Sequence, residues 1–401
     1  MSPGTVPTLA VSPPAPSVLS ISGAGPEKRG RPIRKGGRAL TESKLASTLH
    51  LTRDLASKPA PGVHPAGDPA TQKFPVTVIG GGSWGATLAI HLARKQIPVR
   101  LWDADPLHRA DMARERRCRK YLPEFEFPPC LEVVDEALCP RGGPGFVLLA
   151  VPSHALREVA RDFLTDGKVT WIVATKGLEE GTGLTVSQVV REARPGSSEP
   201  VVVLAGPSLA KEVAEGKPCA ILAASQDDAA AGAVQRLFAT EMFRVYTSSD
   251  PLGVEIGTSL KNVVALASGI LDGLELGQNA RGALLTRGLA EIRRLGEAIG
   301  ARAETFLGLA GVGDLVTTCT SPLSRNHTLG VALGKGETME SAMARIGMVV
   351  EGVRTTRGAV TLAKRVGVEM PIAVQVHRIL FEGVPPAEAL RELMTRPLKA
   401  E

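Results

Sequence analysis

A glycine-rich loop that directly follows a short apolar run constrains the fold of this chain more than any other feature. Residues 76–79 read Val-Thr-Val-Ile, and Gly80, Gly82 and Gly85 then follow in the pattern G-x-G-x-x-G. In a strand–turn–helix unit, the first glycine permits a tight turn, the second lets a pyrophosphate approach the backbone, and the third lets the helix pack closely on the strand. Free N–H groups at the start of such a helix favour the negative charge of phosphates. The loop therefore predicts a dinucleotide-binding unit, and a plain glycine-rich turn is the alternative.

The residues after this loop alternate between short apolar runs and helical stretches. A helix is predicted over residues 84–94, and further strands are predicted over residues 99–102, 146–151, 171–174 and 201–204. Short runs that are entirely apolar are typical of parallel strands buried on both faces. Strands that alternate with helices indicate right-handed crossovers. The fold class is therefore α/β, with an N-terminal Rossmann-type doubly wound sheet.

The second half of the chain has a different pattern. Beyond about Asp250 the strand-like runs become rare, and apolar residues recur at helical spacing, as in Leu285, Leu289, Ile292, Leu295 and Ile299. Segments of this kind continue as far as Leu393. The sequence therefore predicts a nucleotide-binding domain over residues 73–250 and a mostly α-helical domain over residues 251–401.

Residues 1–72 differ in composition from the rest. They are rich in Pro, Ser, Gly and Ala, they contain few acidic residues, and they lack the apolar core of a secretory signal. Such a segment buries too little apolar surface to offset the loss of chain entropy on folding. We predict a disordered N-terminal extension. A transit peptide and a start codon placed too far upstream are the alternatives.

Composition excludes several classes of protein. The net charge is +6 and only 3% of residues are aromatic, which argues against a surface that stacks nucleic-acid bases. The sequence holds no uninterrupted apolar run of about 18 residues, so no membrane span is predicted. The five cysteines form no CxxC pair, so we expect neither a disulfide framework nor a metal site, and a reducing compartment fits this pattern.

An acidic residue ends the second predicted strand. Asp103 lies about 20 residues past the glycines, where a carboxylate commonly binds the ribose hydroxyls of NAD. A solvated carboxylate at a strand end is the alternative. No arginine follows directly to receive the 2′-phosphate of NADP, although His108 and Arg109 lie one turn further on.

Two lysines occupy unusual positions. Lys261 is the only charge in the apolar helical run 260–271, where desolvation would lower its pKa and suit it to proton transfer. Lys176 follows the predicted strand 171–174, at the edge of the sheet where ligands of such folds bind. The alternative for Lys261 is a lysine whose stem packs in the core while its ammonium reaches water. The alternative for Lys176 is a solvated loop lysine.

Three further turns carry polar side chains. Ser208 follows the strand 201–204 and is either a helix N-cap or a substrate contact. Asp314 ends the turn Gly311-Val312-Gly313. Arg325 lies between Ser324 and Asn326, and arginine is well suited to bidentate phosphate recognition.

Taken together, these segments closely resemble the bacterial-type glycerol-3-phosphate dehydrogenase family, from Val76 to about Leu393. The shared motifs include Gly-Gly-Gly-Ser-Trp-Gly at 80–85, Ala-Thr-Lys-Gly-Leu-Glu at 174–179, Ala-Gly-Pro-Ser at 205–208 and Leu-Lys-Asn-Val at 260–263. They continue with Asn-Ala-Arg-Gly-Ala-Leu-Leu-Thr-Arg-Gly-Leu-Ala-Glu at 279–291, Gly-Leu-Ala-Gly-Val-Gly-Asp-Leu at 308–315, Ser-Arg-Asn at 324–326 and Val-Val-Glu-Gly at 349–352. The ordered set is far more specific than any one motif.

The resemblance implies a role for each matching residue. Lys261 matches the family's catalytic lysine, which exchanges the proton on the C2 oxygen, and Lys176 matches a lysine that contacts substrate and cofactor. Substrate contacts are implied for Gly206, Ser208, Asp314, Ser324, Arg325 and Asn326. Cofactor contacts are implied for Ser83, Trp84, Ala210, Arg325, Val349 and Glu351, in addition to the glycines and Asp103.

The implied activity is reversible hydride transfer between NAD(P)H and dihydroxyacetone phosphate, which supplies glycerol 3-phosphate for glycerophospholipid synthesis. The cofactor is therefore NAD or NADP. The family commonly carries Arg or His at the position of Ala104, but here Ala104 precedes Asp105, so we expect a preference for NAD. The alternatives to this activity are a related hydroxyacid dehydrogenase with another substrate and a non-catalytic nucleotide-binding module. We also expect a cytoplasmic homodimer.

Overall fold

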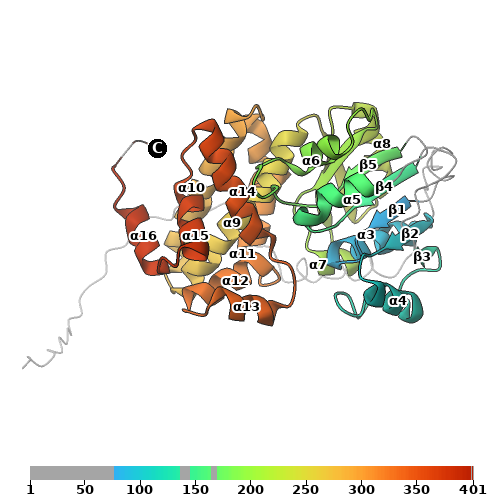
Figure 1. The fold of residues 1–401 in the computed structure, drawn as a ribbon, viewed down its shortest axis with the longest axis horizontal. Helices are drawn as coiled ribbons and strands as arrows, with labels where there is room; N and C mark the ends of the chain where they lie inside the picture. Colours follow the sequence, from blue (N-terminus) through green and yellow to red (C-terminus); the bar gives the residue numbers. More distant parts are fainter. Residues whose placement is uncertain (1–75, 136–144, 164–168, 399, 401) are drawn as a thin grey trace, which may run out of the picture. The chain divides into compact units, whose positions relative to one another are not determined.

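Eight strands form one sheet at the centre of the N-terminal half. The computed structural model describes residues 76–135, 145–163, 169–398 and 400, all within the compact unit Ala66–Glu401. The strands follow the order β3-β2-β1-β4-β5-β6-β7-β8 across the sheet (Figure 1). Their bounds are Val76–Ile79 (β1), Val99–Trp102 (β2), Leu131–Val133 (β3), Gly145–Leu149 (β4), Val169–Val173 (β5), Val201–Ala205 (β6), Cys219–Ala224 (β7) and Phe243–Ser248 (β8).

Six strands run parallel, and the last two reverse direction. β1 pairs with β2 on one side and with β4 on the other, so the connections turn in opposite directions from the centre of the sheet. This is the doubly wound arrangement predicted above, and it places a crevice at the carboxyl ends of β1 and β4. β7 pairs antiparallel with β6 and parallel with β8, so the sheet is mixed and not wholly parallel.

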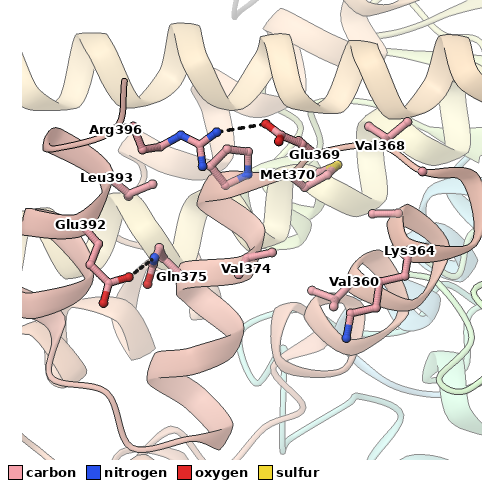
Figure 2. Close-up of a pocket in the computed structure, with 13 residues that line it drawn as sticks. Val360, Lys364, Val368, Glu369, Met370, Val374, Gln375, Glu392, Leu393 and Arg396 are labelled. Atoms are coloured by element: carbon pink, nitrogen blue, oxygen red, sulfur yellow. Dashed lines mark hydrogen bonds and ion pairs between the residues drawn. The ribbon is translucent and has the colours of Figure 1, made fainter. Parts of the chain in front are cut away.

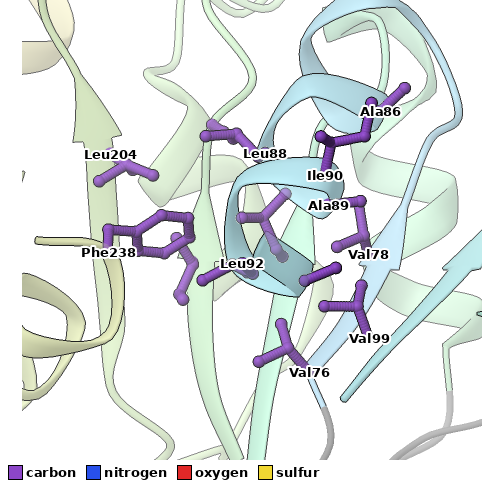
Figure 3. Packing of buried hydrophobic residues seen from close by; sticks show 14 of the residues in the cluster. Val76, Val78, Ala86, Leu88, Ala89, Ile90, Leu92, Val99, Leu204 and Phe238 are labelled. Carbon is purple, nitrogen blue, oxygen red and sulfur yellow. The ribbon is translucent and has the colours of Figure 1, made fainter. Parts of the chain in front are cut away.

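Helices cover both faces of the sheet. One face packs against α3 (Ser83–Arg94), α7 (Ala210–Ala214) and α8 (Asp228–Phe238), and Figure 3 shows Leu88, Ile90 and Leu92 of α3 against Val76 and Val78 of β1. The opposite face packs against α5 (Leu156–Asp162) and α6 (Val186–Ala193). Because both faces are buried, the central strands consist of short apolar runs.

The second half of the described chain is built around one helix. α9 (Pro251–Gly273) is buried from Gly253 to Leu271 (Figure 1). It packs against α10 (Gly277–Ala298), α11 (Asp314–Thr320), α12 (Arg325–Gly334), α14 (Glu351–Val366) and α15 (Pro371–Phe381). α13 (Met339–Ile346) packs on α12, and α16 (Pro386–Met394) packs on α15. Among the described helices, only α9 has the length and hydropathy of a membrane span, and the protein buries it completely.

Glycines allow α12 to lie very close to α9. A Cβ added at Gly269 would lie 2.1 Å from the carbonyl oxygen of His327, and one at Gly330 would lie 2.2 Å from that of Leu266. Gly273 and Gly334, one turn further along each helix, meet in the same way. The backbones of the two helices are therefore in direct contact, and this contact fixes the position of α12 relative to α9.

The predicted elements differ from the structure at several points. All five predicted strands and the predicted helix are present, whereas β3, β7 and β8 were not predicted. The strands end at Ser248 and α9 begins at Pro251, and the domain boundaries at residues 72 and 250 stay predictions. The predicted extension, residues 1–72, lies outside the described residues.

Candidate active site

The glycine loop forms an open cradle at the crevice between β1 and β4. Gly80 has a φ of +109°, and a Cβ there would lie 2.6 Å from the carbonyl oxygen of Ala150. Gly85 must also be glycine, because its Cβ would lie 1.9 Å from the oxygen of Gly80. By contrast, nothing lies within 4 Å of a Cβ added at Gly82. The loop thus leaves room beside Gly82, where a pyrophosphate would approach the backbone.

The first turn of α3 offers unused hydrogen-bond donors to this space. Gly82 is the N-cap residue, and no side chain caps the helix there. The indole Nε1 of Trp84 is buried and has no hydrogen-bond partner among the described residues. The oxygen of Ala210 accepts a hydrogen bond from Thr87, one turn after Ser83, so α7 begins beside α3. Free donors and open space together fit the phosphates of a dinucleotide.

Asp103 connects the end of β2 to the glycine loop. Its Oδ2 accepts a hydrogen bond from the backbone N–H of Gly81 at 2.7 Å, and its Oδ1 accepts one from Asp105 at 3.0 Å. The carboxylate therefore stabilises the loop, while its expected contact with a ribose stays a prediction. Asp105 caps α4 (Pro106–Glu115) by accepting from the backbone N–H groups of Leu107 and His108.

The two basic residues near Asp103 are directed at the backbone. Arg109 donates to the carbonyl oxygen of Asp103 at 2.6 Å, and its guanidinium lies over the ring of Trp102. His108 lies 3.2 Å from the oxygen of Gly81 and packs edge-on against Tyr121. Tyr121 belongs to a segment between α4 and β3, and its ring meets His108 edge-on next to the glycine loop. Sequence reasoning missed Tyr121 because no helix or strand periodicity marks that segment.

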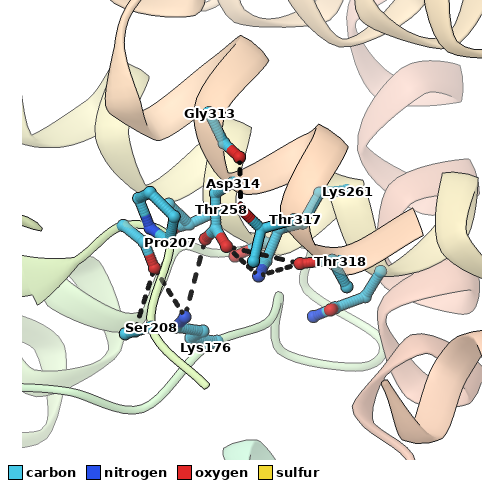
Figure 4. A network of polar contacts seen from close by, with 12 residues as sticks. Lys176, Pro207, Ser208, Thr258, Lys261, Gly313, Asp314, Thr317 and Thr318 are labelled. Atoms are coloured by element: carbon cyan, nitrogen blue, oxygen red, sulfur yellow. Dashed lines mark hydrogen bonds and ion pairs between the residues drawn. The ribbon is translucent and has the colours of Figure 1, made fainter. Parts of the chain in front are cut away.

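A buried lysine and a buried aspartate form the centre of the second part of the site. The Nζ of Lys261 lies 2.5 Å from Oδ1 of Asp314 and 2.7 Å from the hydroxyl oxygen of Thr318 (Figure 4). Lys261 is only 5% exposed. Burial lowers the pKa of Lys261 to about 8, although the carboxylate of Asp314 opposes this shift. The predicted proton-transfer lysine is therefore buried and paired with a carboxylate, and its pKa lies closer to neutral pH than that of an ordinary lysine.

A second lysine approaches the same carboxylate from the sheet. Lys176, which follows β5, places its Nζ 3.5 Å from Oδ2 of Asp314 and 3.3 Å from the carbonyl oxygen of Gly206. Ser208 donates to the same oxygen of Gly206 at 3.0 Å. Within the described residues, Oδ2 of Asp314 is buried without a hydrogen-bond partner. Such an atom is costly unless a ligand completes its bonding, so it fits a substrate hydroxyl.

A widened helical turn brings Asp314 to the lysines. Residues Leu309–Gly313 form a π-helix directly before α11, and such turns frequently occur at functional sites. Gly311 lies so close to Phe306 that a Cβ would be 1.8 Å from its oxygen. Gly257 of α9, one turn before Lys261, would similarly place a Cβ 2.4 Å from the oxygen of Ala310. These contacts dock the turn onto α9, so Asp314 and Thr318 both reach Lys261.

The first turn of α12 forms the remaining side of the site. Ser324 caps the helix by accepting from the N–H of His327, as its type predicts. Asn326 donates to Oδ1 of Asn262, and its own Oδ1 accepts from the N–H of Gly352. Asn262 directly follows Lys261, so this amide pair fixes α12 beside the reacting lysine. We did not assign Asn262 a role from sequence, although the motif Leu-Lys-Asn-Val contains it.

The predicted cofactor contacts near α14 lie beside α12. Arg325 is exposed and donates to the carbonyl oxygen of Val349 at 2.7 Å. Glu351 accepts hydrogen bonds from Ser153, which follows β4. The predicted site residues therefore come from both halves of the chain. Hydrogen bonds and ion pairs join the two lysines, Asp314, Gly206 and Ser208 into one network, while the glycine loop forms a separate group.

A pocket elsewhere in the structure contains none of these residues. It has a volume of about 470 Å³ and lies between α14, α15 and the end of α16 (Figure 2). Its wall includes Val360, Met370 and Leu393, with the ion pair of Glu369 and Arg396 at one end. It lacks a titratable group buried beside a nucleophile or a phosphate-binding set, so we place the chemistry at the lysines instead. Within the described residues, no three His, Cys, Asp or Glu side chains group together as metal ligands would.

The nucleotide cradle and the paired lysines together define an NAD(P)-dependent oxidoreductase of the Rossmann class. Two family models match this chain: the N-terminal part of NAD-dependent glycerol-3-phosphate dehydrogenase over residues 75–231, and its C-terminal part over residues 250–391. The chain belongs to the NAD-dependent glycerol-3-phosphate dehydrogenase family.

Individual relatives support this membership. The chain is 49% identical over 330 residues to a glycerol-3-phosphate dehydrogenase [NAD(P)+] of Thioalkalivibrio sulfidiphilus, covering 82% of this chain and 98% of that protein. It is 47% identical over 333 residues to the enzyme of the same name from Geobacter sulfurreducens, covering 81% and 98%. The crystal structure of glycerol-3-phosphate dehydrogenase from Coxiella burnetii matches with a TM-score of 0.76 and 40% identity, covering 81% and 99%.

Proposed function

We propose that this chain reduces dihydroxyacetone phosphate to sn-glycerol 3-phosphate with NAD(P)H, and catalyses the reverse reaction with the same groups. The observation that carries this proposal is the buried network of Lys261, Asp314 and Lys176, which lies at the carboxyl edge of the sheet beside the nucleotide cradle. Reduction of a ketone needs a proton donor at its oxygen and a fixed cation near it. This network supplies both.

Lys261 is the group that moves the proton. NAD(P)H, when bound at the glycine loop, would supply a hydride to C2 of the ketone, so negative charge would develop on the carbonyl oxygen. The ammonium of Lys261 donates a proton to that oxygen, and in the reverse reaction the neutral amine accepts it. A pKa of about 8 allows both forms to be present near neutral pH. Lys176 stabilises the developing charge electrostatically, and Asp314 holds both ammonium groups in place.

The first turn of α12 suits the phosphate end of the substrate. Arg325 and Asn326 are expected to bind the phosphate, with Ser324 at the helix N-cap. Asn262 joins this turn to the residue next to Lys261, so phosphate binding orients C2 toward the lysine. Gly206 and Ser208 are expected to contact the substrate from the side of the sheet. A hydroxyacid without phosphate would leave this set unused, which argues against the alternative substrate.

The reaction is tested by following NADH absorbance with dihydroxyacetone phosphate. We expect rapid oxidation by the parent chain and a loss of at least about 100-fold in kcat for Lys261→Ala, because general acid catalysis contributes roughly that much. Ser341→Ala, which removes an exposed hydroxyl bonded to Glu337, is the control and should be unaffected. A folded parent chain that binds NADH but does not oxidise it with this ketone contradicts the proposal.

We also propose that NAD is preferred over NADP. The side chain after Asp103 is the methyl of Ala104, and the carboxylate of Asp105 follows, held in place as the N-cap of α4. A fixed negative charge there would repel a 2′-phosphate, while Arg109 is engaged with the carbonyl oxygen of Asp103. We expect kcat/KM to be higher with NADH than with NADPH. A value for NADPH tenfold above that for NADH would overturn this preference.

Finally, we propose that the enzyme works as a cytoplasmic homodimer that supplies glycerol 3-phosphate for glycerophospholipid synthesis. The family suggests the pathway and the location, and the free thiols of Cys118, Cys130, Cys219 and Cys319 fit a reducing compartment. The dimer is inferred from the large helical half. Sedimentation equilibrium of the purified chain tests it, and a monomer at micromolar concentration would contradict it.

A further inference from the structure

One serine–glutamate contact joins the two halves of the chain at Glu351, one of the predicted cofactor contacts. Ser153 lies four residues after the end of β4, where it begins a short 3-10 turn, and Glu351 is the first residue of α14. The backbone N–H of Ser153 donates to Oε1 of Glu351 at 3.2 Å, and its hydroxyl donates to Oε2 at 2.7 Å. One residue therefore holds both oxygens of the carboxylate, which fixes the plane of the carboxylate as well as its position.

The neighbours of this contact place it next to the reacting groups. A Cβ added at Gly177 would lie 3.2 Å from the Cβ of Ser153 and 3.4 Å from Oε2 of Glu351. The preceding residue, Lys176, reaches Asp314 in the catalytic network. Gly177 is itself fixed, because its N–H and carbonyl oxygen both bond the hydroxyl of Ser259. Glu351 thus lies beside the segments that follow β4 and β5, next to the residue that follows Lys176.

Opposing influences act on the charge of Glu351. Burial raises the pKa of Glu351, whereas the hydroxyl and N–H of Ser153 and the guanidinium of Arg325 lower it. His154 also lowers the pKa of Glu351. The N-terminus of α14 also favours a negative charge at its first residue. An ionised carboxylate only accepts hydrogen bonds, so its partner in a ligand must be a donor.

We propose that Ser153 is a positioning residue for the cofactor: it orients the ionised carboxylate of Glu351 to accept a hydrogen bond from the carboxamide N–H of the nicotinamide. This inference rests on the proposed function, because it requires the nicotinamide ring to lie over the substrate held by Lys176 and Lys261. The carboxamide is the part of the ring system that carries an N–H donor, and orienting it selects which face of the ring meets the substrate.

The chain contains a matched control for this contact. Ser187 of α6 donates its N–H to Oε1 of Glu255 at 2.6 Å and its hydroxyl to Oε2 at 2.8 Å. This pair also joins the sheet half to the helical half, and burial raises the pKa of Glu255 to about 7. Among the described residues, the side-chain partner of Ser187 is Glu255, which is not one of the predicted site residues. If Ser153 only holds the two halves together, Ser153→Ala and Ser187→Ala should behave alike.

The test measures NADH binding to the full chain without substrate, by quenching of protein fluorescence, from about pH 6 to about pH 8.5. Loss of the Ser153 hydroxyl removes a donor that lowers the pKa of Glu351, so Glu351 becomes protonated at a higher pH. For Ser153→Ala we expect NADH to bind roughly tenfold more weakly than to the parent near pH 6, which is the size of effect that the loss of one hydrogen bond to a charged group produces. Near pH 8.5 the NADH affinities of Ser153→Ala and of the parent should agree within about threefold.

Three further variants separate the possible causes. Ser153→Thr retains a hydroxyl and should restore the parent pH profile, while Ser187→Ala should lower thermal stability and leave that profile unchanged. Glu351→Gln carries no ionisable group at position 351, so in that background Ser153→Ala should leave the pH profile of NADH binding unchanged. A Ser153→Ala profile parallel to that of the parent, or a Ser153→Ala effect that persists in the Glu351→Gln background, overturns the proposal. Because no ketone is present, failure to reduce dihydroxyacetone phosphate would contradict only the proposed reaction.

Discussion

At the scale of single residues, the two acid–base groups of the site act on each other. Burial lowers the pKa of Lys261, and the carboxylate of Asp314 raises it, so the value near 8 is a balance between desolvation and a close opposite charge. Thr318 completes the bonding of the ammonium without adding charge. The position of this balance determines the pH range in which the enzyme works in each direction.

The pH dependence of turnover tests that balance. Reduction needs the protonated lysine, so kcat should fall as the pH rises through about 8, whereas oxidation of glycerol 3-phosphate should increase over the same range. Asp314→Asn removes the carboxylate that raises the pKa of Lys261, so the falling limb for reduction should move to lower pH. The measurement is a profile of kcat against pH in both directions. An unmoved limb in Asp314→Asn would show that another group titrates.

At the scale of elements, the glycines between α9 and α12 determine where the phosphate-binding turn lies. A Cβ at Gly330 would be 2.2 Å from the carbonyl oxygen of Leu266, so a larger residue must push the helices apart. Because α12 carries Arg325 and Asn326 at its first turn, such a displacement moves the phosphate-binding groups away from Lys261. Packing and substrate affinity are therefore coupled at this crossing.

We predict that Gly330→Ala lowers the free energy of unfolding by about 1–3 kcal/mol, as overpacking typically does, and also raises KM for dihydroxyacetone phosphate. Gly282→Ala in α10 is the control, because nothing lies within 4 Å of its added Cβ. That change should stabilise the protein by about 0.5–1 kcal/mol through a less flexible unfolded chain. Denaturant unfolding and steady-state kinetics measure both effects. Equal stability of the two variants would exclude close helix contact at Gly330.

Sequence patterns predicted elements with strong local signals and missed those that depend on distant partners. The first strand, its glycine loop and the lysine in an apolar helix were all visible locally. β3 has only three residues with Glu132 in the middle, so no apolar run marks it. In β8, Phe243 and Val245 are buried while Arg244 and Tyr246 face solvent. This strand is therefore not a continuous apolar run like the buried central strands. No periodicity could predict that Ser153 meets a carboxylate 198 residues away.

At the scale of the whole molecule, buried carboxylates join elements that are distant in sequence. Glu255 of α9 accepts from Ser187 of α6, and Glu291 of α10 accepts from the N–H of Ile372 at the start of α15. Burial raises the pKa of each glutamate to about 7. In the unfolded chain these groups titrate near 4.5, so the folded protein binds more protons than the unfolded chain between these values. Their contribution to stability is fully present below about pH 4.5 and is lost as the pH rises through about 7.

The prediction is that Glu255→Gln weakens the pH dependence of stability. The variant carries no ionisable group at this position, so at about pH 8 it should be more stable than the parent by up to roughly 3 kcal/mol, the equivalent of the pKa difference. Near pH 5 the two should be similar. Thermal unfolding at both pH values provides the measurement. A parent whose stability increases from pH 5 to pH 8, with an unchanged difference from the variant, would contradict the raised pKa.

The glycine contact between α9 and α12 has a consequence for the length of substrate that the enzyme accepts. The paired glycines repeat after four residues on each helix, which is about one helical turn. Moving this crossing by one turn would change the span between the reacting lysine and the phosphate-binding turn by about 5.4 Å, without altering any group that touches the substrate. The register between α9 and α12 therefore determines the length of substrate that fits between the lysine and the phosphate-binding turn. Redesign toward longer phosphorylated ketones should begin with this register and leave the catalytic residues as they are.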